Sequence, residues 1–504
     1  MGLLCVYVVV RGVVGAASRL FWFDELFTLT IAGQPSLHDM WTAIRSGFDS
    51  APPLFYLVER AALGLSSNQQ IALRLPSILA FPCTLICLFV YAKKRNGALL
   101  ACMCALLFLA TSVFHTYLIE ARAYSMVIAC IAFALVCYQR MPGRGWTALF
   151  GLALLLAESL HYYALFAMIP FWIAEGVALV QTRNFRWPTW VALICGLLPV
   201  AVFWPLLMTY KKSYGPNMFA RPSFSAVRGY YGSFFLLTDN ALGIAVATVA
   251  FAATAWVCLW SDKQTVEQSH EQNGNIVEGV LLLGFLALPV ITFVLTNAVN
   301  GILLSRYVMA TTIALVLGIA IAASMAGRRA TALFVLFVFC VVGVRELSFW
   351  LHRENDQFKP DFSAISANQV QQMQKFVQSA GHADLPVVVS DCLLYSQFVY
   401  YLEPGWTNRL VFLTDEQREF RSSRADTNSK SMLAFSKFFP VRVKDYSEFT
   451  AANPDFLLYY EYFDWYVPAL TQDGFSLELV ASDNQGYGQV YLVRTKRASD
   501  GRAN

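Results

Sequence analysis

The sequence is poor in charge, because Asp, Glu, Lys and Arg make up only 14% of its 504 residues. An ordinary soluble domain carries roughly 25% charged residues. Hydrophobic residues reach 57%, and apolar runs long enough to cross a bilayer recur over the first two-thirds of the chain, for example at residues 75–92 and 98–114. This composition excludes a soluble protein and predicts a polytopic α-helical membrane protein.

Several signals of other protein classes are absent. The net charge of +4 is small, and the basic residues gather in short loops, so we expect no nucleic-acid partner. The eleven cysteines form no CxxC pair and no Cys/His set with metal spacing. No Asp-x-Asp occurs, so the sequence predicts no metal ligand and leaves the cofactor unknown, with a divalent metal still open. The first apolar stretch has no basic n-region and no A-x-A-like cleavage site, so it does not resemble a secretory signal peptide.

The apolar segments predict about eleven membrane spans. They lie near residues 3–20, 75–92, 98–114, 123–139, 145–158, 162–180, 187–209, 241–260, 277–297, 307–325 and 330–346.

Basic residues in the loops predict the orientation of these spans. Lys93 to Arg95, Arg140 with Arg144, Arg183 with Arg186, and Arg328 with Arg329 fall on one face, which we assign to the cytoplasm. With an odd number of spans, the C-terminal region then lies on the opposite face. We therefore expect a multi-pass protein of the bacterial cytoplasmic membrane, whose active site and C-terminal domain face the periplasm or exterior.

The composition predicts two domains: a membrane module over residues 1–350, with a long first external loop at 21–74, and a soluble α/β domain over 351–504. In the second domain, residues 386–389, 456–460 and 488–494 are typical of strands, and 368–379 has helical spacing. We find no phosphate-binding loop and no catalytic triad there.

The first external loop opens with Trp22-Phe23-Asp24-Glu25 at the rim of the first span. Two neighbouring acids are unlikely to share one role, because neighbouring side chains on a helix or strand point in different directions. Asp24 is thus either a loop acid or helix cap, or a base for an acceptor hydroxyl or amine, with Glu25 orienting it. The residues alone leave both readings open.

The same loop contains residues 37–44 and 54–63, which are amphipathic and predict helices along the membrane surface. Pro52-Pro53 suits the first turn of the second helix. Asp49 would then be either its N-terminal cap or an acceptor-binding residue, and the two readings stay open.

Polar groups recur at the other external boundaries, in Glu120-Ala121-Arg122-Ala123-Tyr124, His161-Tyr162 and Arg306-Tyr307. Arginine can extend to lipid headgroups, but it also matches phosphate by bidentate hydrogen bonds. Arg122 and Arg306 are therefore candidate phosphate ligands. The packing role is favoured for His161.

Arg11 lies inside the first apolar segment, where a charge is costly. If that segment begins upstream of Met1, Arg11 lies mid-span and would face an acid or a phosphate inside the bundle.

Together these motifs resemble the GT-C membrane glycosyltransferases, in the branch of protein O-mannosyltransferases and lipid A aminoarabinose transferases. The matching stretches cover roughly residues 1–330 and are an Arg in the first span, Trp22 to Glu25, Asp49 to Tyr56, Leu73 to Ser77, Glu120 to Tyr124, His161-Tyr162 and Arg306-Tyr307. Many relatives have His where Ala51 stands, so any role of that histidine is absent here or supplied elsewhere.

The resemblance implies inverting transfer of a sugar from a polyprenyl-phosphate donor to a lipid, glycan or protein acceptor. It implies that Asp24 is the base and Glu25 its support. Donor phosphate and sugar would contact Arg122, Tyr124, Arg306, Tyr307, His161 and Arg11. Acceptor binding or loop ordering would fall to Asp49, Glu120 and Trp22.

Two other classes remain open from the sequence. A lipid or solute transporter or flippase also uses many spans and buried charge, but transporters usually carry internal repeats, and none is evident here. A non-catalytic lipid-binding scaffold could keep the donor pocket, although it would have no need of both Asp24 and Glu25.

Overall fold

The computed structural model describes residues 1–214, 217, 222–234, 240–260, 269–298, 301–352, 367–460, 465–482 and 488–495. The chain forms two compact units. The helix unit comprises Met1–Ser18, Ala51–Pro205 and Ala220–Pro360. The sheet unit comprises Arg19–Ser50, Leu206–Phe219 and Asp361–Asn504.

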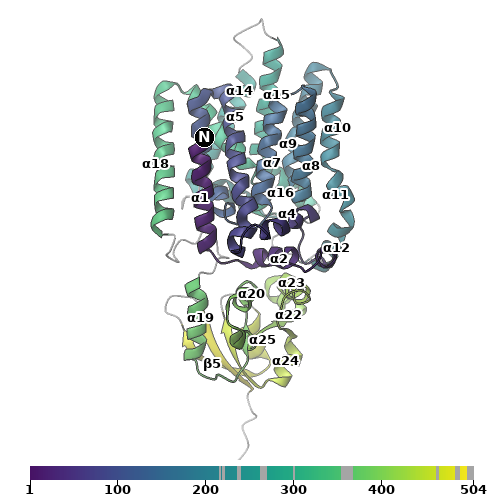
Figure 1. The fold of residues 1–504 in the computed structure, drawn as a ribbon, viewed down its shortest axis with the longest axis vertical. Coiled ribbons are helices and arrows are strands. Elements are labelled where there is room, and N and C mark those ends of the chain that lie inside the picture. Colours follow the sequence, from purple (N-terminus) through teal and green to yellow (C-terminus); the bar gives the residue numbers. More distant parts are fainter. Residues whose placement is uncertain are drawn as a thin grey trace, which may run out of the picture. The chain divides into compact units, whose positions relative to one another are not determined.

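Helices make up the helix unit (Figure 1). They are α1 (Gly2–Ser18), α4 (Pro53–Leu63), α5 (Gln69–Leu109), α6 (Ser112–Tyr117), α7 (Tyr124–Gln139), α8 (Arg144–Leu160), α9 (Ala164–Thr182), α10 (Trp187–Gly196), α11 (Leu198–Val202), α13 (Phe224–Ser233), α14 (Asn240–Trp260), α15 (Ser269–Leu286), α16 (Leu288–Ala298), η1 (Ser305–Tyr307), α17 (Thr311–Met325) and α18 (Arg328–His352).

Small residues allow the helices of this unit to approach closely. A Cβ atom added at Gly284 of α15 would lie 3.0 Å from Pro170 of α9, and one at Gly318 of α17 would lie 3.0 Å from Ala250 of α14. In lipid, helix association relies on such close packing, because the hydrophobic effect gives little drive once the helices are inserted.

Helices occupy each of the predicted spans, and three helices in the described residues are long and apolar enough to cross a membrane. The count rises to six if each of three helix pairs, bent at a short break, forms one span. The described residues also include shorter apolar helices, such as α7 and α17. The figure of about eleven spans therefore stays a prediction.

The second and third predicted spans are parts of one assigned helix, α5, which is interrupted at Gly97 with φ of 75°. The third span was predicted to continue to residue 114, but α5 ends at Leu109. The reason is Thr111, whose hydroxyl oxygen accepts from the Phe114 amide and thereby caps a new helix, α6.

A six-stranded sheet in the order β3-β2-β1-β4-β6-β5 forms the core of the sheet unit. Its strands are β1 (Val387–Val389), β2 (Leu410–Thr414), β3 (Val443–Asp445), β4 (Asp455–Tyr460), β5 (Phe475–Ser482) and β6 (Gln489–Thr495). The first four are parallel, and β6 pairs antiparallel with both β4 and β5. The three predicted strands coincide with β1, β4 and β6, whereas β2, β3 and β5 were not predicted.

Helices of the sheet unit connect and flank these strands. They are α2 (Phe23–Ala32), α3 (Leu37–Ser46), most of α12 (Trp204–Tyr214), α19 (Ala367–Ser379), α20 (Cys392–Tyr401), α21 (Pro404–Thr407), α22 (Glu416–Ser423), α23 (Thr427–Phe435), α24 (Tyr446–Ala452) and α25 (Tyr466–Gln472).

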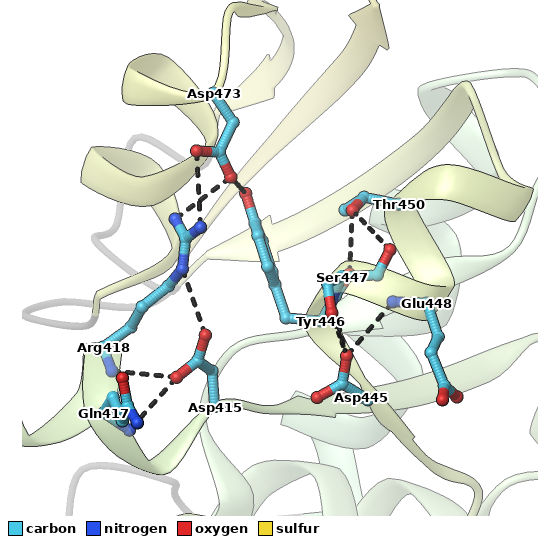
Figure 2. A network of polar contacts seen from close by, with 9 residues as sticks. All are labelled: Asp415, Gln417, Arg418, Asp445, Tyr446, Ser447, Glu448, Thr450 and Asp473. Atoms are coloured by element: carbon cyan, nitrogen blue, oxygen red, sulfur yellow. Dashed lines mark hydrogen bonds and ion pairs between the residues drawn. The ribbon is translucent and has the colours of Figure 1, made fainter.

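Two parallel strands pass directly into capped helices at their carboxyl ends (Figure 2). Asp415 follows β2 and accepts from two amides of α22, while Asp445 ends β3 and accepts from two amides of α24. Arg418 bonds to Asp415 and Asp473, and the Tyr446 hydroxyl donates to Asp473 at 2.8 Å. The network holds α22, α24 and the end of α25 together.

The division of the chain differs from the predicted domain boundary at residue 351. The sheet unit also takes in residues 19–50, which comprise the end of the first predicted span and the first part of the external loop with α2 and α3, and residues 206–219. Helix α3 coincides with the amphipathic segment predicted at 37–44, and α4 with the one at 54–63. The two loop helices nevertheless belong to different units.

Candidate active site

A small cavity in the helix unit is lined by four of the residues singled out in the sequence. Tyr124 begins α7, His161 lies in the break between α8 and α9, and Arg306 and Tyr307 form η1. The remaining lining residues are Val127, Ile128, Ile131, Tyr163, Ala164, Ala167, Met309 and Ala310. Residues almost 200 positions apart in sequence thus meet at one place.

Aromatic rings form one wall of this cavity. The rings of Tyr163 and Tyr307 stack with centroids 3.4 Å apart and planes 10° apart. His161 lies beside them, with its ring centroid 5.2 Å from that of Tyr124. Its Nδ1 accepts a hydrogen bond from the Tyr163 amide at 3.2 Å, so a neutral His161 carries its proton on Nε2.

Arg306 contributes a positive charge to the lining of the cavity. Its guanidinium carbon lies 5.7 Å from the centroid of the Tyr124 ring, within the range of a cation–π interaction. The cavity volume is about 20 Å³, which is room for about one water molecule. Any larger ligand would have to displace lining side chains, of which the tyrosines Tyr124, Tyr163 and Tyr307 are among the bulkiest.

Three of the sequence motifs come together beside α7. The Ser77 hydroxyl donates to the carbonyl oxygens of Glu120 at 2.6 Å and Arg122 at 3.1 Å. The guanidinium of Arg122 lies 5.8 Å from the ring of Phe55 in α4. Glu120 and Arg122 are both buried. Arg122 is therefore held in the turn that leads to Tyr124, although it does not line the cavity.

Arg11 lies in a different cluster, between α1, α6 and α18. Its Nε donates to Glu346 Oε2 at 2.6 Å, and its Nη2 donates to His115 Nδ1 at 2.9 Å. The Tyr7 hydroxyl donates to the same carboxylate oxygen at 2.5 Å. Arg11 is 1% exposed, and it faces an acid inside the bundle. It does not line the cavity of Arg306.

Asp24 and Glu25 lie in the first turn of α2, in the sheet unit. Glu25 is fully buried and its Oε2 accepts from the Trp22 amide at 3.1 Å, which satisfies a donor at the helix start. Asp24 is partly exposed between buried Phe23 and Glu25. The two acids thus differ in environment, and a negative charge in a first turn is favoured by the helix dipole.

Of the two readings left open for Asp49, the structure contradicts the one in which it caps the helix after Pro52-Pro53. Pro52 is the N-cap of α4 and no side chain caps that helix, while the Asp49 carboxylate accepts from the Ser50 amide. A cap must be the residue next to the first turn, and Asp49 precedes that turn by too many residues. This result does not test whether Asp49 binds the acceptor.

Tyr214 of α12 is a residue that sequence reasoning missed. It is buried, its hydroxyl donates to the Phe48 carbonyl at 2.7 Å, and it lies within electrostatic reach of both Asp24 and Asp49. Sequence gave no signal for it, because residues 206–219 join the first loop only in the folded sheet unit.

Two further residues had a signal in the sequence but were not chosen as site residues. Tyr163 belongs to the boundary His161-Tyr162-Tyr163 between two predicted spans, and it stacks on Tyr307. Glu346 is the last residue of the final predicted span, and the costly charge of Arg11 in an apolar segment called for an acid as its partner. Among the residues that the structure describes, no group of three or more His, Cys, Asp and Glu side chains could hold a metal ion.

Comparison with known proteins found no matching family profile and no matching curated protein. A crystal structure of ArnT from Cupriavidus metallidurans bound to undecaprenyl phosphate is similar at 13% identity, over 97% of each chain, with a TM-score of 0.41. A crystal structure of an Archaeoglobus fulgidus oligosaccharyltransferase in complex with Zn and sulfate is similar at 10% identity, over 90% of this chain and 68% of that chain, with a TM-score of 0.45.

Both are glycosyltransferases.

Proposed function

We propose that this chain is a glycosyltransferase that moves a sugar from a polyprenyl-phosphate donor to a lipid, glycan or protein acceptor at the outer face of the cytoplasmic membrane. One observation supports it above the others: Arg306, Tyr124, His161 and Tyr307, from three separate motifs, line one cavity with Tyr163. Packing alone would not require a guanidinium among aromatic side chains at this point.

The donor phosphate would contact Arg306. A guanidinium offers paired donors in the geometry of phosphate oxygens, and it keeps its charge at any physiological pH. Tyr124, Tyr163 and Tyr307 give flat walls with hydroxyl groups at their edges, which suit a ring with both apolar faces and polar rims. Arg122, held by Ser77 in the turn before Tyr124, adds a second positive charge two residues before this lining tyrosine.

Transfer would proceed as one displacement. The acceptor oxygen or nitrogen forms a bond to the anomeric carbon while the bond from that carbon to the phosphate oxygen breaks. The acceptor proton passes to a base, and polyprenyl phosphate leaves with the electron pair. Attack opposite the leaving phosphate inverts the anomeric centre, and arginines lower the barrier by matching the charge that develops on it.

Asp24 is the base in this proposal, and Glu25 supports it. Glu25 is buried, and its carboxylate accepts from the Trp22 amide at the start of α2. Asp24 is partly exposed and can approach an acceptor. The loop charges assign Asp24 and Arg306 to the same membrane face. Tyr214, which lies within electrostatic reach of both Asp24 and Asp49 in the sheet unit, would orient the acceptor together with Asp49.

The experiment begins with mass spectrometry of envelope glycans and glycolipids with and without the gene, which identifies the sugar and acceptor. Release of polyprenyl phosphate by the full-length protein in liposomes then measures transfer. Asp24→Asn should bind the donor normally and lose transfer by about 100-fold or more, the contribution of a general base. Asp39→Asn, which changes a partly exposed acid in the first turn of α3 in the same loop, is the matched control.

Transfer by Asp24→Asn near the parent level would remove Asp24 as the base. Uptake of a labelled solute into proteoliposomes, with no release of polyprenyl phosphate by the parent protein, would overturn the proposed function in favour of transport.

A further inference from the structure

The loop that carries Asp24 is fixed at its first residues by helix α20 of the C-terminal segment. The Phe21 amide donates to the Tyr401 hydroxyl oxygen at 2.6 Å, and the Phe21 carbonyl accepts from Gln397 Nε2 at 2.7 Å. Phe21 and Gln397 are both fully buried. Gln397 and Tyr401 are four residues apart and share one face of α20. Both backbone groups of one residue are therefore held by one helix.

Aromatic packing fixes the rest of α2 in the same way. Phe435, at the end of α23, packs with its ring centroid 4.7 Å from that of Phe27 and 6.2 Å from that of Phe23. Phe48 joins them, 5.2 Å from Phe27 and 5.5 Å from Phe438. The loop thus contributes side chains to the core of the sheet unit.

Local interactions alone would not position α2. The helix has only ten residues, and isolated helices shorter than about 12–15 residues are marginal in water. Its first turn contains Asp24, three residues after Phe21. The direction of the Asp24 carboxylate therefore depends on where α20 and α23 hold the chain.

We infer that Gln397 and Tyr401 are positioning residues for transfer. They hold Phe21 and thereby position the Asp24 carboxylate, so that transfer depends on helix α20 of the C-terminal segment. This inference rests on the proposed role of Asp24. Catalysis is sensitive to such placement, since a shift of 1 Å in a reacting group can lower a rate by about 100-fold.

The test uses two variants of the full-length protein, Tyr401→Phe and Gln397→Leu, each of which removes one bond to Phe21 and keeps the size of the side chain. We expect kcat of transfer to fall by about 10- to 100-fold with little change in KM for the donor lipid. Hydrogen–deuterium exchange of peptides covering residues 21–32 should rise, most of all at the Phe21 amide in Tyr401→Phe.

Tyr395→Phe is the matched control on the same helix. The Tyr395 hydroxyl donates to the Arg442 carbonyl at 2.9 Å and accepts from the Arg442 amide at 2.8 Å. This variant also removes a hydrogen-bonded hydroxyl from α20, but away from Phe21. It should leave kcat and the exchange of residues 21–32 unchanged, even if it lowers the unfolding temperature.

The outcomes separate this inference from the proposed function. Parent-level kcat in both variants, or a loss that Tyr395→Phe shares, would overturn the positioning role. Absence of transfer by the parent protein would overturn the proposed function instead. The exchange data would then decide alone whether Gln397 and Tyr401 hold the loop, and unchanged exchange would reject the inference.

Discussion

The guanidinium of Arg11 donates to Glu346 at 2.6 Å and joins α1 to α18 across 335 residues of sequence. The pair has further partners, because Tyr7 donates to the same carboxylate and His115 accepts from Arg11. The Phe349 ring lies 4.0 Å from the guanidinium carbon and completes its surroundings. A buried ion pair with such additional bonds offsets much of its desolvation cost.

Loss of one member of this pair should strongly destabilise the helix unit. For Arg11→Leu or Glu346→Leu we expect a loss of about 3–5 kcal/mol, because each leaves a buried charge unpaired. The double variant should recover a large part of that loss. Thermal unfolding in detergent measures all three. Arg95→Ala is the control, since the Arg95–Glu278 pair is 3.4 Å long and has side chains 24% and 20% exposed, and should cost about 1 kcal/mol or less. Equal losses at the two sites would contradict this account.

Arg306→Ala should weaken binding of undecaprenyl phosphate. A charge-assisted hydrogen bond contributes about 1.5–3 kcal/mol, so we expect affinity to fall by about 10- to 100-fold. Arg306→Lys should restore it only in part, because an ammonium cannot make the bidentate contact. Native mass spectrometry of the protein with this lipid gives the affinities. Arg228→Ala removes an exposed arginine of α13 and should change little. Unchanged affinity in Arg306→Ala would instead show an arginine that only contacts headgroups.

Glu25 offers a test of whether its charge or its hydrogen bond matters. Glu25→Gln keeps an oxygen that can accept from the Trp22 amide, whereas Glu25→Ala leaves that amide without its acceptor. We expect transfer to be largely kept in Glu25→Gln and strongly reduced in Glu25→Ala, with helix α2 weakened by roughly 1 kcal/mol. Kinetic assays and exchange at residues 22–32 provide the measurements. Equal inactivity of both variants would assign Glu25 a role that needs its charge.

Asp445 should make the stability of the sheet unit depend on pH. A hydrogen bond from the Ser447 side chain, and then one from the Glu448 amide, holds the pKa of this carboxyl below its ordinary value of 3.8. A lowered folded pKa gives stability that is present above about pH 4 and is lost as the pH falls through the folded value. Asp445→Ala should thus cost about 1 kcal/mol at pH 7, and less as the solution becomes more acidic.

Asp445→Asn is the matched control for that measurement. It keeps a side-chain acceptor for the amides of α24 but does not titrate, so its unfolding temperature should stay close to that of the parent at pH 7. Thermal unfolding between pH 3 and 7 compares the three proteins. A constant difference between Asp445→Ala and the parent over this range would contradict the assigned bonds.

Much of the helical framework could be predicted from the sequence, because length and hydropathy decide where a helix can lie in a membrane. The ends of α7 and α8 lie within two residues of the predicted segments. Hydropathy does not reveal side-chain caps, so the third span was predicted too long. Thr111 caps α6, and α5 ends before it at Leu109. Strands β3 and β5 are edge strands that are only partly buried, so neither has the continuous buried apolar run by which β1 and β4 were predicted. Strand β2 does have such a run and was overlooked.

The candidate site, too, could be predicted only in part from the sequence. Sequence alone determined which residue types stand at the rims of the spans: the acids of Trp22 to Glu25, and the Arg and Tyr residues near positions 122 and 306. These are local facts, because a costly charge beside an apolar segment is visible without a fold. Only the tertiary structure decided which residues these groups contact. In the folded chain Tyr163 stacks on Tyr307, and Arg11 pairs with Glu346. The Phe21 amide likewise bonds to Tyr401 of α20, 380 positions later. Such contacts depend on packing between distant segments, which no local pattern specifies.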